Sequence, residues 1–223
     1  MTSKVSNPGE LDFSIRDTSE KALQRCLLLQ TINGNSPRFG SSIINWIDLE
    51  LPVILSKSAR RPSIDLVGRD ENGTLVLCEV KFNNTIDSPH DAECEILNYV
   101  AEILLHYKEL DENKIHHSNM NHMKFKWEEI IEKKPRVMII ADRGYWQHWQ
   151  RKINKAKKAT QKSIRALAGK MIVRDSSIEC YSINIEKDYF KKQFNIKKEP
   201  KEARYKPDLD VNSWSPISMS SLL

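Results

Sequence analysis

The sequence predicts a mixed α/β fold in which helices cover both faces of a mixed central sheet. Three observations support this prediction. Segments with helical spacing alternate along the chain with short β-rich runs. Asn72-Gly73 separates two such β-rich runs, which indicates a hairpin because glycine supplies the positive φ of a tight turn. The run 136–141 contains Val-Met-Ile-Ile, which is typical of a strand buried on both faces.

The first half of the chain is expected to contain one helix and three extended runs. The helix begins at Glu20, with Ser19 as its N-cap, and ends near Asn33-Gly34. Residues 43–49 are apolar with interspersed polar groups and could be helical or extended. The extended runs are 52–55, 63–68 and 74–82, of which the last two are predicted to pair as antiparallel strands.

The second half is expected to alternate helices with single strands. A helix over 89–107 carries a continuous apolar stripe, and a polar insertion over 111–134 contains a short helix around 127–131. The strand 136–141, a long basic helix over 145–168 and a final strand over 178–185 follow. The predicted order is therefore helix, three strands, helix, strand, helix, strand.

The chain has 223 residues, which fits one elaborated domain better than two. We expect a flexible arm over 1–17 and a core over 18–187, which includes the insertion 111–134 and the basic helix 145–168. The segment 188–223 is basic and then rich in proline and serine, and it is expected to add little to the core.

The composition, with 39% apolar and 29% charged residues, is that of an ordinary globular protein. No apolar stretch approaches the ~20 residues of a membrane span, and the first residues do not resemble a signal peptide, so a cytoplasmic protein without a membrane partner is expected. The four cysteines form no C-x-x-C pair, which predicts reduced thiols rather than a zinc knuckle or disulfides.

The net charge of +5 is distributed unevenly: −4 over 1–149, +11 over 150–206 and −2 over 207–223. The basic segment predicts a surface for a polyanion, with nucleic acid the commonest. The candidate phosphate contacts are Arg151, Lys152, Lys155, Lys157, Lys158 and Lys162. A solvated helix face is the alternative interpretation. Trp146 and Trp149 could stack on bases, although helical spacing favours a buried stripe that includes Trp149.

Asp65, Glu79 and Lys81 form the most informative constellation. Side chains alternate along a strand, so Glu79 and Lys81 point to the same face, ~7 Å apart at the backbone. Asp65 and Glu79 lie at similar distances from the Asn72-Gly73 turn, so the three side chains can converge to within about one residue of register.

Two converging carboxylates repel each other and lose solvation when they are partly buried. A divalent cation relieves both effects, and Mg²⁺ or Mn²⁺ favours carboxylate and phosphate oxygens. Such an ion activates water and stabilises the charge that develops on a phosphate, and Lys81 would add positive charge there. The alternative is a surface ion pair between Glu79 and Lys81, but apolar neighbours favour a functional site.

These residues also carry a resemblance to a known family. Ile64-Asp65-Leu66 and Glu79-Val80-Lys81, with thirteen residues between the acids, a connecting hairpin and a following helix, resemble the core of the PD-(D/E)xK nuclease superfamily. The resemblance covers about 19–140 and implies a restriction-endonuclease-like fold with an α-β-β-β-α-β core. It implies metal ligation by Asp65, Glu79 and the Val80 carbonyl, with water activation by Lys81. Pro62 stands three residues before Asp65 instead of next to it.

Family members often place another acid on the first helix, which makes Glu20 the first candidate and Glu50 the second. Glu95 and Tyr99, one helical turn apart, match a polar residue and a tyrosine that often face the site, although Tyr99 could equally pack in the core. His90 is better explained as an exposed loop residue. His116, His117 and His122 match no closed zinc pattern and are interpreted as a polar loop.

The sequence therefore predicts a Mg²⁺-dependent endonuclease or phosphodiesterase that acts on nucleic acid, with DNA favoured, by direct attack of water. The alternative is a non-catalytic nucleic-acid-binding or assembly module on the same fold. A plain protein-interaction domain is a third hypothesis. A homodimer, or a partner protein that supplies specificity, is compatible with either of the first two.

Overall fold

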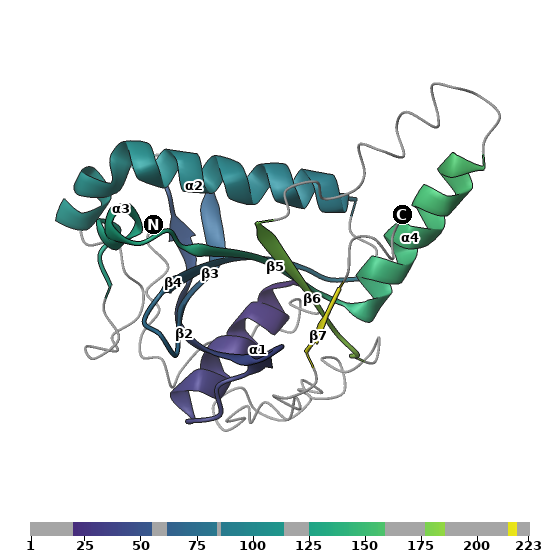
Figure 1. Ribbon diagram of the computed structural model, residues 1–223, viewed down its shortest axis with the longest axis horizontal. Coiled ribbons are helices and arrows are strands. Elements are labelled where there is room, and N and C mark those ends of the chain that lie inside the picture. The colour runs from purple at the N-terminus through teal and green to yellow at the C-terminus, as the bar shows by residue number, and fades with distance from the viewer. Residues whose placement is uncertain are drawn as a thin grey trace, which may run out of the picture.

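The computed structural model describes residues 20–54, 62–83, 86–113, 125–158, 177–185 and 214–217. These residues form a mixed α/β structure in which a seven-stranded sheet is flanked by helices, as predicted (Figure 1). The helices are α1 (Glu20–Ile32), α2 (Pro89–Glu112), α3 (Glu129–Glu132) and α4 (Arg143–Lys157). The strands are β1 (Arg38–Phe39), β2 (Ser42–Pro52), β3 (Ser63–Asp70), β4 (Leu75–Lys81), β5 (Arg136–Asp142), β6 (Ile178–Ile183) and β7 (Ser215–Pro216).

The strands lie side by side in the order of the chain, from β1 to β7. β1 to β4 are antiparallel neighbours, β5 and β6 continue the sheet in parallel with β4, and β7 is antiparallel to β6. The predicted hairpin is confirmed: β3 pairs with β4 in the register Leu66↔Cys78, and Gly73 has a φ of 73° in the turn. The turn therefore sets which residues of β3 and β4 face each other.

The structure decides the two predictions for the segment before β3. Residues 43–49, which could have been helical or extended, belong to β2, whose pairing with β3 runs from Ile44↔Asp70 to Pro52↔Ser63. The expected separate strand over 52–55 is wrong, because the strand ends at Pro52 and the chain bends at Val53 and Ile54. Pairing with β3, and not the local propensity of the sequence, determined that this segment is extended and where the strand ends.

The helix α2 continues to Glu112, beyond the expected end at residue 107. Its start is specified locally, because Ser88 and Asp91 form a capping box and Pro89 occupies the first turn. Its end is held by Asp111, whose carboxylate accepts hydrogen bonds from the backbone N–H groups of Trp127 and Glu128. Residues 114–124 of the predicted insertion lie outside the described residues.

The core consists of two layers, one on each face of the sheet. α1 packs with Leu23 and Leu27 against a face that includes Cys78, Val80 and Phe82. On the other face, α2 and α4 cover a second cluster, whose members include Ile96, Ile103, Tyr145, Trp146 and Trp149. The predicted apolar side of the Lys81 strand thus faces α1.

The predicted basic helix is present as α4, but it begins earlier than expected, at Arg143, and ends at Lys157 with Lys158 as its C-cap. Residues 159–176 lie outside the described part of the chain. The N-terminal arm 1–17 also lies outside it. All four cysteines are free thiols, of which Cys94 is exposed. None of the helices in the described part of the chain has the length and apolar character needed to cross a membrane.

The C-terminal segment contributes to the core, contrary to expectation. Trp214 is buried and its ring lies 4.8 Å from that of Phe39 in β1, next to Tyr181 of β6. A backbone bridge joins Phe39 and Trp214, so the two ends of the sheet approach each other. The expectation failed because a single tryptophan in a polar tail has no periodicity to reveal its burial.

Candidate active site

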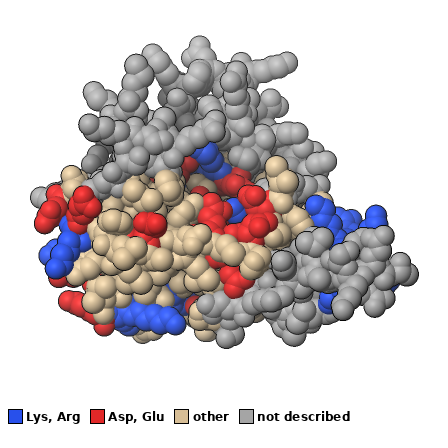
Figure 2. Space-filling view, turned by 90° about the horizontal axis from the view of Figure 1, so that it is seen from above, with Lys and Arg blue, Asp and Glu red and all other residues tan. Residues whose placement is uncertain are grey.

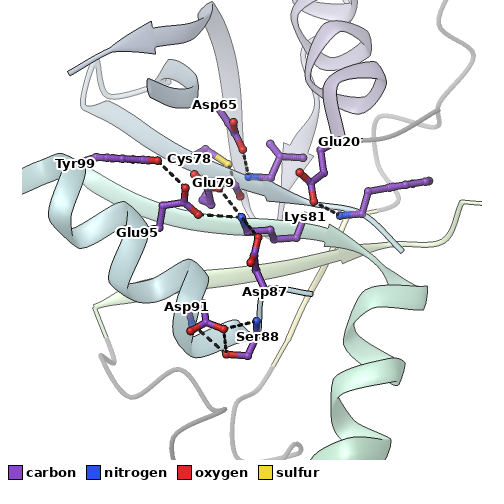
Figure 3. Close-up of polar contacts among 12 residues, drawn as sticks. Glu20, Asp65, Cys78, Glu79, Lys81, Asp87, Ser88, Asp91, Glu95 and Tyr99 are labelled. Atoms are coloured by element: carbon purple, nitrogen blue, oxygen red, sulfur yellow. Dashed lines mark hydrogen bonds and ion pairs between the residues drawn. The ribbon is translucent and has the colours of Figure 1, made fainter. Parts of the chain in front are cut away.

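The ends of β3 and β4 bring Asp65, Glu79 and Lys81 together (Figure 3). The paired part of the hairpin stops at Leu66↔Cys78, so Asp65 and Glu79 occupy the next position on each strand. Beyond Leu66↔Cys78 the backbone pairing of the two strands ends, and the Asp65 carboxylate accepts a hydrogen bond from the backbone N–H of Val80, at 2.8 Å. The convergence expected from the turn is therefore present.

Lys81 is the centre of the arrangement. Its Nζ lies 2.9 Å from Glu79 Oε1, 3.0 Å from Glu95 Oε2 and 3.5 Å from the Asp87 carboxylate. The side chains of Lys81 and Glu79 are each only 4% exposed. Tyr99 donates to the other oxygen of Glu95 at 2.6 Å, so both residues predicted on α2 join the cluster. The first half of α2 thus forms one wall of the site.

The two candidates for an additional acid are separated by the structure. Glu20 reaches the site from the first residue of α1, where its carboxylate accepts from the backbone N–H of Phe82 at 3.4 Å. Glu50 instead pairs with Lys21 at 2.8 Å. Glu20 is therefore placed as predicted, while the placement of Glu50 does not support a role in the site.

Three carboxylates of the site are held in a setting that disfavours ionisation. Burial raises the pKa of Asp65 to about 7, although the Val80 N–H and Lys81 act to lower it. Burial, followed by repulsion from Asp65, raises the pKa of Glu79 well above its usual range. Burial also raises the pKa of Glu20. Lys81 alone does not compensate the negative charge gathered around it.

Lys81 and Glu95 remain charged. Burial alone would lower the pKa of Lys81, but Glu79 and Glu95 outweigh it and raise this pKa well above its usual range. Burial likewise acts to raise the pKa of Glu95, yet hydrogen bonds from Tyr99 and Lys81 lower it. At neutral pH, Lys81 is consequently a fixed ammonium group and not a proton acceptor.

The carboxylate oxygens of Asp65 and Glu79 are of the type that bind a hard divalent cation. Glu79 Oε2 is buried and has no hydrogen-bond partner in the described residues, and Asp65 and Glu79 both resist carrying a charge there. Nevertheless, the described residues contain no group of three or more His, Cys, Asp or Glu side chains arranged to hold a metal ion. Two carboxylates supply oxygen ligands of the kind that Mg²⁺ prefers, and Mg²⁺ usually keeps several waters and takes further oxygens from the substrate.

Sequence reasoning missed Asp87, which contacts Lys81 from the loop before α2. The Ser88-Pro89 helix start was a usable signal, because it places the preceding residue beside the end of β4. Reasoning also missed Asp142, which caps α4 and accepts from the backbone N–H of Asn83 at 2.6 Å. Asp142 thereby ties the chain just after Lys81 to the start of α4.

The basic residues of α4 lie at one end of the face seen in Figure 2, while a group of Asp and Glu residues lies near its middle. Arg151, Lys152, Lys155 and Lys158 are exposed, Lys157 is partly buried, and Lys162 lies outside the described residues. The buried stripe favoured by helical spacing is confirmed for Trp149, and stacking of Trp146 and Trp149 on bases is wrong. Both rings are buried, Trp146 donates to the Tyr181 carbonyl, and Lys152 covers Trp149 at 4.1 Å.

His90 lies in the first turn of α2 and is half-buried, so the expectation of an exposed loop residue is wrong. His90 Nδ1 lies 3.2 Å from Glu93 Oε2 and its Nε2 lies 3.6 Å from Cys94 Sγ, all within the first turns of α2. His116, His117 and His122 lie outside the described residues.

Comparison of the chain with protein-family models, with curated proteins and with solved structures finds no match. The chemistry of the site therefore has to be inferred from the residues themselves.

Proposed function

We propose that this protein is a metal-dependent nuclease that hydrolyses phosphodiester bonds in nucleic acid, with DNA as the favoured substrate. One observation carries the proposal: Asp65 and Glu79 meet beside a buried Lys81, in a setting that raises the pKa of both acids. Such a cluster lowers the stability of the fold, and carboxylates with shifted pKa values beside a charged lysine are typical of functional sites.

We also propose a restriction-endonuclease-like fold, as implied by the resemblance to the PD-(D/E)xK superfamily. The order α1, β2, β3, β4, α2, β5 supports it, because it corresponds to an α-β-β-β-α-β core. The antiparallel β2–β4 segment followed by parallel β5 agrees with the mixed central sheet of this proposal.

Asp65 and Glu79 would hold Mg²⁺ or Mn²⁺, with the Val80 carbonyl as the further ligand that the resemblance implies. When bound, such an ion supplies Lewis-acid stabilisation of phosphate charge and lowers the pKa of a water. Lys81 holds a positive charge where phosphoryl oxygens would lie and can orient a water by donating a hydrogen bond. Glu95 fixes the ammonium group, and Tyr99 fixes Glu95.

The basic face of α4 would hold the phosphate backbone. The helix α4 follows directly on β5, the strand that pairs with the Lys81 strand, and its exposed lysines and Arg151 lie in its second half. This gives an acidic site that needs a cation and a neighbouring surface that attracts a polyanion.

Calorimetry with Mg²⁺ and Mn²⁺ tests the metal site, and cleavage of plasmid, linear and single-stranded DNA tests the activity. We expect wild type to bind the ion and to cut DNA, and Asp65→Ala to lose both properties. The matched control is Glu128→Gln, which removes an exposed acid away from the site and should leave both unchanged. A wild type that binds DNA but neither binds metal nor cuts any of these substrates would refute the proposal.

The second candidate is a nucleic-acid-binding or assembly module on the same fold without catalysis. The pairing of Lys81 with Glu79 and Glu95 favours it, because both contacts form without a metal. It predicts salt-dependent DNA binding that Mg²⁺ and Asp65→Ala leave unchanged.

A further inference from the structure

The ammonium group of Lys81 has three hydrogens, and three carboxylates of the described residues contact it. Glu79 lies 2.9 Å from Nζ, and its side chain is only 4% exposed. Glu95 lies at 3.0 Å and is held at its other oxygen by Tyr99. Asp87 is the most distant of the three, at 3.5 Å, and the most exposed, at 54% of its side chain (Figure 3). An anion from solvent therefore reaches Lys81 most directly at the position of Asp87.

The side chain of Asp87 is loosely held. Among the described residues, Lys81 is its only ion-pair or hydrogen-bond partner. The nearby Asp91 shows the contrast, because its carboxylate accepts two hydrogen bonds from Ser88 in the capping box of α2. Ile86, on the other side of Asp87, has a side chain that is 90% exposed and does not anchor this segment to the core. The Asp87 carboxylate can thus leave Lys81 without disturbing the start of α2.

Asp87 adds negative charge to a site that already has an excess of it. Burial raises the pKa of Glu20, and the charge of Asp87 acts in the same direction. A carboxylate and a phosphate diester each carry one negative charge and accept hydrogen bonds from an ammonium group through oxygen. Asp87 therefore makes the kind of contact with Lys81 that a nucleic-acid phosphate would make. Because like charges repel at this range, the two cannot occupy the same position beside Lys81.

We propose that Asp87 occupies the position at which Lys81 receives a phosphate of the substrate, so that the carboxylate and the phosphate compete for the third hydrogen of the ammonium group. Asp87 is then an autoinhibitory contact of the free protein, which the substrate displaces toward solvent. This inference rests on the proposed function for the identity of the ligand, a nucleic-acid phosphate. It assigns Asp87 neither to the metal nor to the chemical step.

The test compares Asp87→Asn with Glu109→Gln, because both changes remove one negative charge without shortening the side chain. Glu109 is a close match in its surroundings: its side chain is 59% exposed and makes one loose contact, at 3.5 Å, with His106. It lies about 20 Å along α2 from Glu95. This separation exceeds the Debye length of ~8 Å at physiological ionic strength, so Glu109 has little influence on an anion at the site.

The first measurement is the affinity for a phosphorothioate thymidine oligonucleotide, which keeps the charge of DNA and resists cleavage. Fluorescence anisotropy is recorded with Mg²⁺ at physiological ionic strength. We expect Asp87→Asn to bind about two- to fivefold more tightly than wild type, the range given by one half-exposed ion pair, and Glu109→Gln to bind as wild type does. With cleavable DNA, Asp87→Asn should lower KM by a similar factor and leave kcat unchanged, because the competing contact acts on binding.

The second measurement observes Lys81 directly. The ¹⁵N NMR signal of its ammonium group is followed while the same oligonucleotide is added to wild type, Asp87→Asn and Glu109→Gln. We expect the signal to move in all three proteins, and to reach half of its change at a two- to fivefold lower oligonucleotide concentration in Asp87→Asn. Tighter binding without any movement of this signal would mean that Asp87 only repels DNA from a distance, which overturns the proposal.

The outcomes separate this inference from the proposed function. If wild type cuts no DNA, the nuclease proposal fails, and the two binding measurements still decide the role of Asp87. Equal affinity of wild type and Asp87→Asn overturns the competition, as does the absence of oligonucleotide binding in both. Weaker binding or a lower kcat in Asp87→Asn also overturns it, because Asp87 would then assist the substrate instead of competing with it.

Discussion

At the scale of single residues, the site is organised around the buried ammonium group of Lys81, which has more carboxylates near it than its charge can neutralise. Glu20, Asp65, Glu79 and Glu95 all act on Lys81 or on each other, and three of these four acids have raised pKa values. Burial is the first cause in each of the three. The consequence is a site whose stability depends on pH and on any cation that binds there.

The first prediction concerns pH. The pKa of Asp65 rises from 3.8 to about 7 on folding, so between these values the folded protein holds a proton that the unfolded chain has released. The free energy of unfolding should therefore fall as pH rises from about 4 to 7. Asp65→Asn keeps an acceptor for the Val80 N–H but cannot ionise. It should be more stable than wild type at pH 8, by on the order of 2 kcal/mol after allowing for partial exposure.

Urea denaturation at pH 5 and pH 8 without divalent ions measures this difference. Glu79 and Glu20 contribute in the same direction, so Asp65→Asn should reduce the pH dependence without abolishing it. An unchanged pH dependence in Asp65→Asn would contradict the assignment.

The second prediction concerns the ion pair of Lys81 and Glu79. Lys81→Met leaves a buried carboxylate without its partner, and should lower the free energy of unfolding by about 3 kcal/mol at pH 8. Glu79→Gln in the Lys81→Met background removes that uncompensated charge and should restore much of the loss. The double-mutant cycle is measured by urea denaturation; equal losses in the single and double variants would rule out this ion pair as the cause.

At the scale of elements, the hairpin and the strand before it determine where the site acids end up. β2 pairs with β3 along nearly its whole length, with a shift in register between Trp46 and Asp48. Gly68 of β3 faces Trp46 just before this shift. A Cβ on Gly68 would lie 2.9 Å from the Asn45 carbonyl oxygen and 2.9 Å from a ring carbon of Trp46. Only glycine allows β2 and β3 to approach this closely.

The third prediction follows from this approach. Gly68→Ala forces the Asn45 backbone or the buried Trp46 ring to move, and should lower the free energy of unfolding by about 1–3 kcal/mol. Ser41→Ala, at an exposed position before β2, is the control and should change stability by less than ~0.5 kcal/mol. A thermal or urea denaturation curve for Gly68→Ala that overlays that of wild type would show that β2 accommodates the added Cβ with no loss of stability.

At the scale of the whole molecule, the charged residues are unevenly distributed over the described surface. The basic residues of α4 lie at one end of the face in Figure 2 and a group of Asp and Glu residues lies near its middle, while further Lys and Arg residues lie among acids at the other end. A nucleic acid would be held by the first group, while its phosphate meets the second only after cation binding lowers the negative charge. Binding and cleavage should therefore depend on different residues.

The fourth prediction separates these two dependences. Changing Lys155, Lys157 and Lys158 to Gln should weaken DNA binding without Mg²⁺ and reduce the salt slope of log K by about 2–3. The same change at Lys108, Lys126 and Lys134, which are exposed near the opposite end of α2 and around α3, is the control and should have little effect. Fluorescence anisotropy at several salt concentrations measures the slope. Equal slopes for both triple variants would place the nucleic-acid surface elsewhere.

How far the sequence predicts the molecule depends on the range of the interactions involved. The hairpin, the cap of α2, the strand 136–141 and the meeting of Asp65 with Glu79 and Lys81 were predictable because each follows from local turn chemistry, capping or side-chain alternation. The nuclease chemistry stays a prediction until metal binding and cleavage are measured.

By itself, the sequence determined the mixed α/β class and the convergence of Asp65, Glu79 and Lys81, since both depend on contacts close along the chain. Only the tertiary structure decided that Glu20 and not Glu50 joins them, that Asp87 pairs with Lys81 and that Trp214 completes the core. These outcomes depend on how α1 and α2 pack against the sheet and on how the C-terminal segment joins it beside β6. Contacts between segments far apart in the chain leave no periodic signal in a single sequence.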